Sequence, residues 1–337
     1  MRVLLSARAG VGIHARAERP LFWPLAVAGL TMVLIGLVLF QQHKQLAAEA
    51  TSGALGSWQI LDDKHFNSPT GLAEDRDHHL YVADSANQHL YKLAADGQVI
   101  GVFGAPGAAP GQFGRPSAIV VDPIGILYVA DTANNRIQEL NPAGNFIVAY
   151  GSAGSGPGQF NNPRGVALDH EGDIFVADTG NDRIQKLSPL GKVLAIWGHS
   201  GAGLGEFHQP FGLSVDADGS IYVADSGNHR VEKLSPSGAA MAQFGAYGTD
   251  LGEFDYPRWI ALDSRGDLFV SDSYNHRVQE LSPAGLPIAQ FGGQGGQVGQ
   301  FRRPEGLVVD DLGAMVVVDA DNDRLQRFNP GPVPGLP

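Results

Sequence analysis

The chain has 337 residues, of which 43% are hydrophobic and 17% are charged, and its net charge is −12. This composition excludes an intrinsically disordered protein, and the negative charge argues against a partner with a phosphate backbone, such as RNA or DNA. There is no cysteine, so a disulfide framework and a thiolate-bound metal are excluded as well.

The first expected element is a membrane-spanning helix. Residues Leu21 to Phe40 carry no charge, and twenty helical residues match the roughly 30 Å hydrocarbon layer of a bilayer. Four arginines and one glutamate precede this stretch. The positive-inside rule therefore predicts a cytoplasmic segment 1–20, a single-pass signal-anchor helix 21–40 in the cytoplasmic membrane, and a periplasmic or extracellular location for all that follows.

A cleaved signal peptide is the alternative for this N-terminal stretch. Ala48-Glu49-Ala50 has the small-x-small form of a processing site. We favour the anchor because the apolar run is longer than the hydrophobic region of a signal peptide. Residues 41–55 then form a tether.

After the tether the sequence repeats itself. One copy reads VADTGNDRI at 176–184: an apolar run ends in Asp, small residues and Asn follow, and a second run begins at Arg. This is the composition of a tight hairpin between two strands. A period of this length, without a helix, is typical of a propeller blade. The aspartate recurs every 47 residues, at Asp84, Asp131, Asp178, Asp225, Asp272 and Asp319.

Each copy predicts four short strands, which in the third copy are 165–169, 173–178, 183–187 and 192–197. Six copies predict an all-β fold: a six-bladed β-propeller of four-stranded antiparallel blades over residues 56–330, followed by a tail 331–337.

The last copy lacks a fourth strand of its own, because the chain after Phe328 is rich in proline. Residues 56–61 alternate like the other fourth strands. They are predicted to pair with the third strand of the last blade, which would close the ring and remove an open edge.

The pattern PxG(V/L)xxD followed by (Y/F)VADTxNxR(I/V)Q resembles the NHL repeat, and the resemblance covers residues 66–328. It implies a six-bladed propeller, here of a membrane-anchored bacterial type. Propellers that resemble this one include metal-dependent lyases and lactonases, and some proteins with similar repeats bind RNA on a basic face. This chain is acidic and its histidines lack the spacing of metal ligands, so we expect no metal, no cofactor and no nucleic acid.

The repeated hairpin residues are predicted to be structural, since six equivalent blades do not need six active sites. The aspartate is expected to accept N–H groups of the turn and to pair with the arginine five residues later, while Asn134, Asn181 and Asn228 adopt the left-handed turn conformation. Copy one has His89 in place of the arginine. The arginines of the other five copies are Arg136, Arg183, Arg230, Arg277 and Arg324.

Function is expected where the copies differ. The residue after each repeat proline opens the innermost strand beside the central channel, on the side where the blades are entered, which we call the entry face. We predict a ligand pocket there, in which arginine forks hold a carboxylate or phosphate against an aromatic wall. The alternative is that its charged side chains pair with each other and plug the channel. The predicted pocket residues are Arg164, Phe211, Arg258, Trp259 and Glu305.

A further exception is Glu74, whose five counterparts are apolar and are expected in the core between blades. A buried carboxylate needs a partner, and Arg76 and His79 are the candidates.

Together these features predict a membrane-anchored extracytoplasmic propeller that acts as a binding or scaffolding module for a protein, glycan or small ligand through its entry face. A propeller enzyme, a lyase or a lactonase-like hydrolase acting in the central channel, is the alternative. No catalytic residue is predicted, because inner strands such as GVALD at 165–169 offer almost only apolar side chains.

Overall fold

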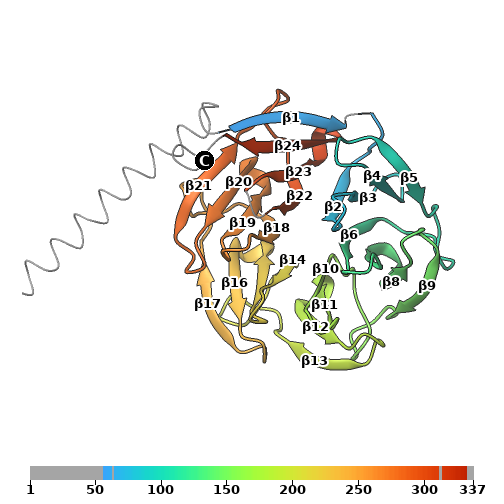
Figure 1. Cartoon of the computed structure of the whole chain (residues 1–337). Coiled ribbons are helices and arrows are strands. Elements are labelled where there is room, and N and C mark those ends of the chain that lie inside the picture. Colours follow the sequence, from blue (N-terminus) through green and yellow to red (C-terminus); the bar gives the residue numbers. More distant parts are fainter. Residues whose placement is uncertain (1–55, 63, 311–312, 332–337) are drawn as a thin grey trace, which may run out of the picture. The chain divides into compact units, whose positions relative to one another are not determined.

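The computed structural model describes residues 56–62, 64–310 and 313–331. Within these ranges, twenty-four strands form six four-stranded sheets. The sheets stand around a central axis with β2, β6, β10, β14, β18 and β22 innermost (Figure 1). The predicted all-β, six-bladed propeller with antiparallel four-stranded blades is confirmed.

Each of the first five blades consists of four consecutive strands, running from the axis outwards. Blade 1 contains β2 (Pro69–Glu74), β3 (Leu80–Asp84), β4 (His89–Leu93) and β5 (Val99–Phe103). Blade 2 contains β6 (Pro116–Val121), β7 (Leu127–Asp131), β8 (Arg136–Leu140) and β9 (Phe146–Tyr150). Blade 3 contains β10 (Gly165–Leu168), β11 (Ile174–Asp178), β12 (Arg183–Leu187) and β13 (Val193–Trp197).

The remaining blades follow the same order. Blade 4 contains β14 (Pro210–Val215), β15 (Ile221–Asp225), β16 (Arg230–Leu234) and β17 (Ala240–Phe244). Blade 5 contains β18 (Pro257–Leu262), β19 (Leu268–Asp272), β20 (Arg277–Leu281) and β21 (Pro287–Gly292). Blade 6 contains β22 (Pro304–Val309), β23 (Met315–Asp319), β24 (Arg324–Pro330) and, as its outer strand, β1 (Gly56–Asp62).

The pairing of β1 with β24 confirms the predicted closure of the ring. The two strands are antiparallel, with Trp58 opposite Phe328 and Gly56 opposite Pro330. The indole of Trp58 packs 5.2 Å from the rings of both Phe301 and Phe328. The first strand of the described chain is thereby fixed to the last, and no blade is left with an open third strand.

Glycines let the inner strands of neighbouring blades approach each other at the axis. A Cβ atom on Gly165 would lie 2.1 Å from the carbonyl oxygen of Phe211, and one on Gly212 would lie 2.5 Å from that of Arg258. A larger residue at either position would push the blades apart. This close approach is what brings the residues preceding these glycines together around the channel.

The predicted N-terminal segments 1–20, 21–40 and 41–55 lie outside the described residues, as does nearly all of the tail 331–337. In the part of the chain that is described, no helix has the length and apolar character needed to cross a bilayer.

Deleting residues 56–62 from the full chain should destabilise the propeller, because blade 6 loses its outer strand and the contacts of Trp58. Removing a packed tryptophan alone costs about 3 kcal/mol or more, and for a domain of this size we expect the melting temperature to fall by at least about 6 °C. Calorimetry or circular dichroism measures the change. Deletion of residues 332–337 is the control, and an unchanged melting temperature after removal of β1 would contradict the closure.

Candidate functional site

The hairpins of the entry face are held by one buried carboxylate in each blade. In blade 3, one oxygen of Asp178 accepts the N–H of Asn161 at 2.7 Å, and the other accepts Nε of Arg183 at 2.7 Å and Nε2 of Gln185 at 3.0 Å. Arg183 also donates to the carbonyl oxygens of Gly156 and Gln159 at 2.8 and 3.0 Å. The carboxylate and the guanidinium thus tie the hairpin to the loop that enters the same blade.

The same contacts recur in the other blades. In blades 2 to 6 the arginine Nε lies 2.7–2.8 Å from the carboxylate, and all six aspartates are fully buried. In every blade the aspartate accepts a backbone N–H of the entering loop. The turn contributes the side-chain amide of its asparagine. The aspartates are Asp84, Asp131, Asp178, Asp225, Asp272 and Asp319, and the arginines are Arg136, Arg183, Arg230, Arg277 and Arg324.

The left-handed residue of the hairpin is displaced from its predicted position. In blades 2 to 6 the turn is a short 3-10 helix, and the positive φ belongs to the residue after the asparagine. Asn181 instead donates to Asp178, while Asp182 has φ of 51°. The turns are η1 (Thr132–Asn134), η2 (Thr179–Asn181), η3 (Ser226–Asn228), η4 (Ser273–Asn275) and η5 (Ala320–Asn322).

Each hairpin reaches over to the next blade and fixes the start of its inner strand. Thr179 of blade 3 donates to the carbonyl oxygen of Pro210 at 2.7 Å, and Asp182 accepts the N–H of Gln209 at 2.7 Å. Equivalent contacts position Tyr256, whose N–H is accepted by His229 Nδ1 at 3.2 Å. These bonds hold the backbone on both sides of the repeat proline. The side chain of the residue after the proline therefore points in a fixed direction.

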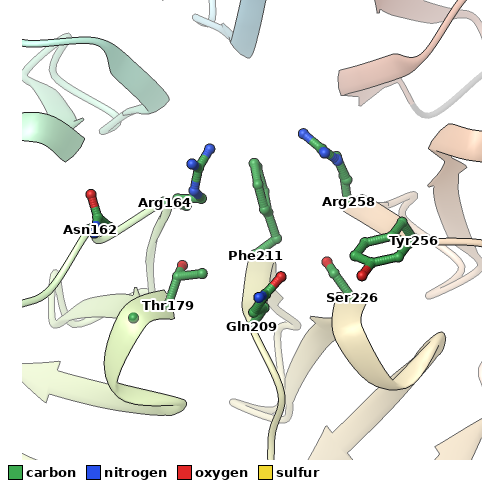
Figure 2. Close-up of a pocket in the computed structure, with 9 residues that line it drawn as sticks. Asn162, Arg164, Thr179, Gln209, Phe211, Ser226, Tyr256 and Arg258 are labelled. Atoms are coloured by element: carbon green, nitrogen blue, oxygen red, sulfur yellow. The ribbon is translucent and has the colours of Figure 1, made fainter.

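Four of the five predicted pocket residues meet at the entry end of the channel. Figure 2 shows three of them, Arg164, Phe211 and Arg258. Each of the four directly follows the repeat proline of its blade. In blades 4, 5 and 6 the inner strand contains a β-bulge at this point. A β-bulge changes the direction of the side chains next to it. The guanidinium carbons of Arg164 and Arg258 lie 5.1 and 4.9 Å from the centre of the Phe211 ring, one on each side of it in Figure 2. Arg258 Nη1 lies 2.8 Å from the carboxylate of Glu305.

Trp259 does not join this group. Its side chain is 8% exposed and lines the opposite, apolar end of the channel, in a cavity of about 300 Å³ with Leu262 and Val309. The predicted aromatic wall therefore consists of Phe211 without Trp259. Arg258 and Trp259 are neighbours in sequence but line different cavities of the channel.

Glu74 lines the same apolar end and is a second correction. Its side chain is 20% exposed and its carboxylate lies 2.8 Å from Nδ1 of His78. It is therefore not a carboxylate enclosed between blades, and its partner is neither Arg76 nor His79.

The charges at the entry end do not balance. Four arginines and one glutamate line the adjoining cavities of about 330 and 170 Å³, namely Arg115, Arg164, Arg258, Arg303 and Glu305. Arg258 and Arg303 both contact Glu305, and Arg303 also contacts Asp321. The structure gives Arg164 no carboxylate among the described residues, so mutual pairing explains Arg258 and Glu305 but not Arg164.

Two buried atoms at this site also lack partners. Arg258 Nε and Glu305 Oε2 have no hydrogen bond to any described residue. Buried polar atoms without partners are rare in proteins and mark positions where water or a ligand completes the structure. Burial, together with the nearby positive charge of Arg258, lowers the pKa of Arg164 from its ordinary value.

Sequence reasoning missed part of this site. Arg303, Tyr256 and Arg115 immediately precede the repeat proline. Comparing the position before the proline across the six copies would have singled them out, since the other copies have Ser68, Asn162 and Gln209 there.

Two acidic clusters have the composition of cation ligands but already serve as turns. They are Asp75, Asp77 and His79 between β2 and β3, and Asp169, Glu171 and Asp173 between β10 and β11. Asp75 Oδ1 accepts the N–H groups of residues 77 and 79 at 2.9 Å, and Asp169 Oδ1 does the same for residues 171 and 173 at 3.0 and 2.9 Å. We assign no metal to either cluster.

The comparisons with known proteins agree with this fold. The model of the NHL repeat matches residues 113–140, 160–187, 207–234 and 254–281. The chain is thus a six-bladed propeller that carries NHL repeats. Comparison with curated proteins gives no match.

Solved enzyme structures share the architecture. A streptogramin B lyase superposes with a TM-score of 0.61 at 15% identity, over 82% of this chain and 99% of that chain. A virginiamycin B lyase from Staphylococcus aureus with quinupristin gives 0.58 at 13% identity, over 81% and 99%. A gluconolactonase from Xanthomonas campestris gives 0.63 at 15% identity, over 85% and 93%. At these identities the likeness concerns the fold alone.

Blade 4 departs from the other hairpins in a way that makes stability depend on pH. Gln138, Gln185, Gln279 and Gln326 donate to the buried aspartate of their blade, whereas blade 4 has Glu232 at this position. Burial, with repulsion from Asp225, raises the pKa of Glu232 to about 7, although Arg230 lies 2.6 Å away. The proton is therefore bound more tightly in the folded protein than in the unfolded chain.

The substitution Glu232→Gln should stabilise the protein at pH 8. Between the unfolded pKa of 4.5 and the folded value of about 7, the ionised side chain progressively reduces stability as pH rises. We expect a gain of about 1 to 3 kcal/mol at pH 8 that declines towards zero below about pH 5. Urea unfolding at both pH values measures it. The reverse change Gln185→Glu is the matched control and should destabilise at pH 8; a gain that is independent of pH would contradict the assignment.

Proposed function

We propose that the propeller is a binding module whose entry-face pocket, formed by Arg164, Phe211, Arg258 and Glu305, takes an anionic group of its ligand. The observation that carries this proposal is Arg164, a half-buried guanidinium that has a neighbouring arginine but no carboxylate partner among the described residues. An unpaired charge at such a position destabilises the empty protein, and an anion would relieve it.

The arrangement suits a carboxylate or a phosphate. Arg164 and Arg258 both line the cavity of about 170 Å³, so both can direct N–H donors at one ligand group there. Phe211 packs against both guanidinium groups. The local positive charge contrasts with the net charge of −12 of the whole chain. This contrast favours a small or singly charged ligand over a polyanion, which the rest of the surface would repel.

Replacing Arg164 or Arg258 by glutamine should weaken the binding of small anions. We expect a loss of about tenfold or more for each, since a hydrogen bond to a charged group contributes about 1.5–3 kcal/mol. Isothermal titration with inorganic phosphate and with glucuronic acid measures the affinity. Arg76→Gln, in the exposed turn between β2 and β3, is the matched control. Unchanged affinity in the folded Arg164→Gln variant would contradict the proposal.

An enzyme acting in the channel is the second candidate, and one observation favours it. Glu305 is a buried carboxylate beside Arg258, and its Oε2 atom has no hydrogen bond to any described residue. Such a carboxylate could act as a general base, and the arginine could stabilise an anion formed in the reaction. The lyase and gluconolactonase structures have the same fold. Hydrolysis of D-glucono-δ-lactone by the protein that disappears in Glu305→Gln would favour this candidate over pure binding.

We further propose that residues 21–40 anchor the propeller outside the cytoplasmic membrane, with residues 1–20 inside and a protein or glycan partner at the entry face. The uncharged stretch and the arginines before it support this orientation.

The absence of cysteine makes the orientation directly measurable. We expect a single Leu190→Cys, at a side chain that is 91% exposed, to react with a membrane-impermeant maleimide in bacterial spheroplasts. Ala7→Cys, before the anchor, should react only after the membrane is permeabilised. Labelling of Ala7→Cys in intact spheroplasts, or protection of Leu190→Cys, would contradict the proposed topology.

A further inference from the structure

A strip of aromatic side chains crosses the entry face and ends at the pocket. It consists of Tyr247, His229, Tyr256 and Tyr274, which we call the aromatic strip. Successive ring centres are 4.8, 4.9 and 4.9 Å apart. The guanidinium of Arg258 lies 5.7 Å from the ring of Tyr274, and Figure 2 shows Tyr256 beside Arg258 at the wall of the pocket. The strip and the pocket therefore form one continuous surface.

The aromatic strip is available to a ligand. Tyr247 is 69% exposed and Tyr274 is 46% exposed. Within the described part of the chain, no protein group hydrogen-bonds the hydroxyls of Tyr247, Tyr256 or Tyr274. Tyrosines with structural roles differ, since Tyr150 donates to Glu139 at 2.8 Å. The strip thus presents ring faces and free hydroxyls to solvent, which is typical of aromatic residues at binding surfaces.

The strip is also an exception to the repeat. The counterparts of Tyr274 are Ala86, Ala133, Gly180, Gly227 and Asp321, and those of Tyr256 are Ser68, Arg115, Asn162, Gln209 and Arg303. The frame of the propeller is therefore built without aromatic rings at these positions. The residue before the repeat proline has a positive φ in all six copies, and the value at Tyr256 is 50°. The left-handed backbone therefore belongs to the frame, and the aromatic ring alone is the exception.

We propose that the entry face binds an oligosaccharide carrying a uronic acid, with sugar rings stacked on the aromatic strip and the carboxylate held by Arg164 and Arg258. This inference rests on the proposed anion-binding function and names its ligand class. A sugar ring has an apolar face bordered by hydroxyls, which matches tyrosine faces with free hydroxyls. The planar carboxylate matches the arginine fork.

The charges beside the strip limit the ligand to few negative groups. Asp255 lies 3.3 Å from Nδ1 of His229, and Asp321 lies next to the pocket on Arg303. A chain with an anion on every unit, such as single-stranded nucleic acid, would place phosphates against these carboxylates. In a neutral oligosaccharide with one acidic sugar, the single carboxylate can lie at Arg164 and Arg258 while the neutral sugar rings lie on the aromatic strip.

The test compares three sugars by isothermal titration against the full-length protein: xylotriose bearing one glucuronic acid, neutral xylotriose, and glucuronic acid alone. We expect the acidic oligosaccharide to bind at least about tenfold more tightly than either of the others, because only it engages both strip and pocket. Tyr247→Ser, at the end of the strip far from the pocket, introduces the residue of the equivalent loop before blade 4, Ser200. It should weaken the acidic oligosaccharide about three- to tenfold and leave glucuronic acid unchanged. Tyr247→Phe, which keeps the ring, is the matched control and should bind like the wild type.

The remaining outcomes separate the two levels of the proposal. If glucuronic acid binds but the acidic oligosaccharide binds no more tightly, the glycan assignment is overturned and the anion pocket stands. If neither binds and inorganic phosphate does not bind either, both fail. If a thymidylate pentamer binds more tightly than the acidic oligosaccharide and this binding is lost in Tyr247→Ser, the strip recognises nucleic acid bases, which also overturns the glycan assignment.

Discussion

The entry face depends on one interaction that recurs in every blade, the acceptance of several hydrogen bonds by a buried aspartate. In blade 3 the two carboxylate oxygens of Asp178 accept four hydrogen bonds. The donors are the backbone N–H of Asn161 in the entering loop and the side chains of Asn181, Arg183 and Gln185. A buried carboxylate is stable only when it is satisfied in this way. The loop, the hairpin and the third strand are thereby held in fixed relative positions.

This frame decides where the chain is free to vary. The hairpin hydroxyl and the left-handed residue bind the backbone of the next blade, so the inner strand begins at a fixed place whatever its side chains are. Glycines such as Gly165 and Gly212 then bring neighbouring inner strands together at the axis. The residue after the proline hydrogen-bonds the backbone of the next blade in blades 1 and 2, through Thr70 and Ser117, and is free of this task where its side chain cannot do so. Arg164 and Phe211 occupy such positions, and this explains how an identical frame can hold an individual site.

Much of this could be predicted from the sequence, because a strict 47-residue period aligns equivalent positions without coordinates. The period predicted the blades, the closing strand and the grouping of Arg164, Phe211, Arg258 and Glu305. Depth along the axis and turn geometry were not accessible in this way. Trp259 was misplaced because it follows Arg258 in sequence but lies at the apolar end of the channel, and the left-handed turn residue was misplaced by one. His229 and Tyr274 stand out among the aligned hairpins. Their contact with Tyr247 and Tyr256 could not be predicted, because these residues come from loops of two blades that only the folded ring brings side by side.

The central claim is that residues shared by all blades maintain the frame, while the exceptions around the axis form a site for an anion. Anomalous diffraction from crystals of the propeller soaked in selenate tests it most directly, because the anion can be located without knowledge of the natural ligand. The account predicts a selenium peak within hydrogen-bonding distance of the guanidinium groups of Arg164 and Arg258. Peaks elsewhere on the surface, with none between these two arginines, would contradict it.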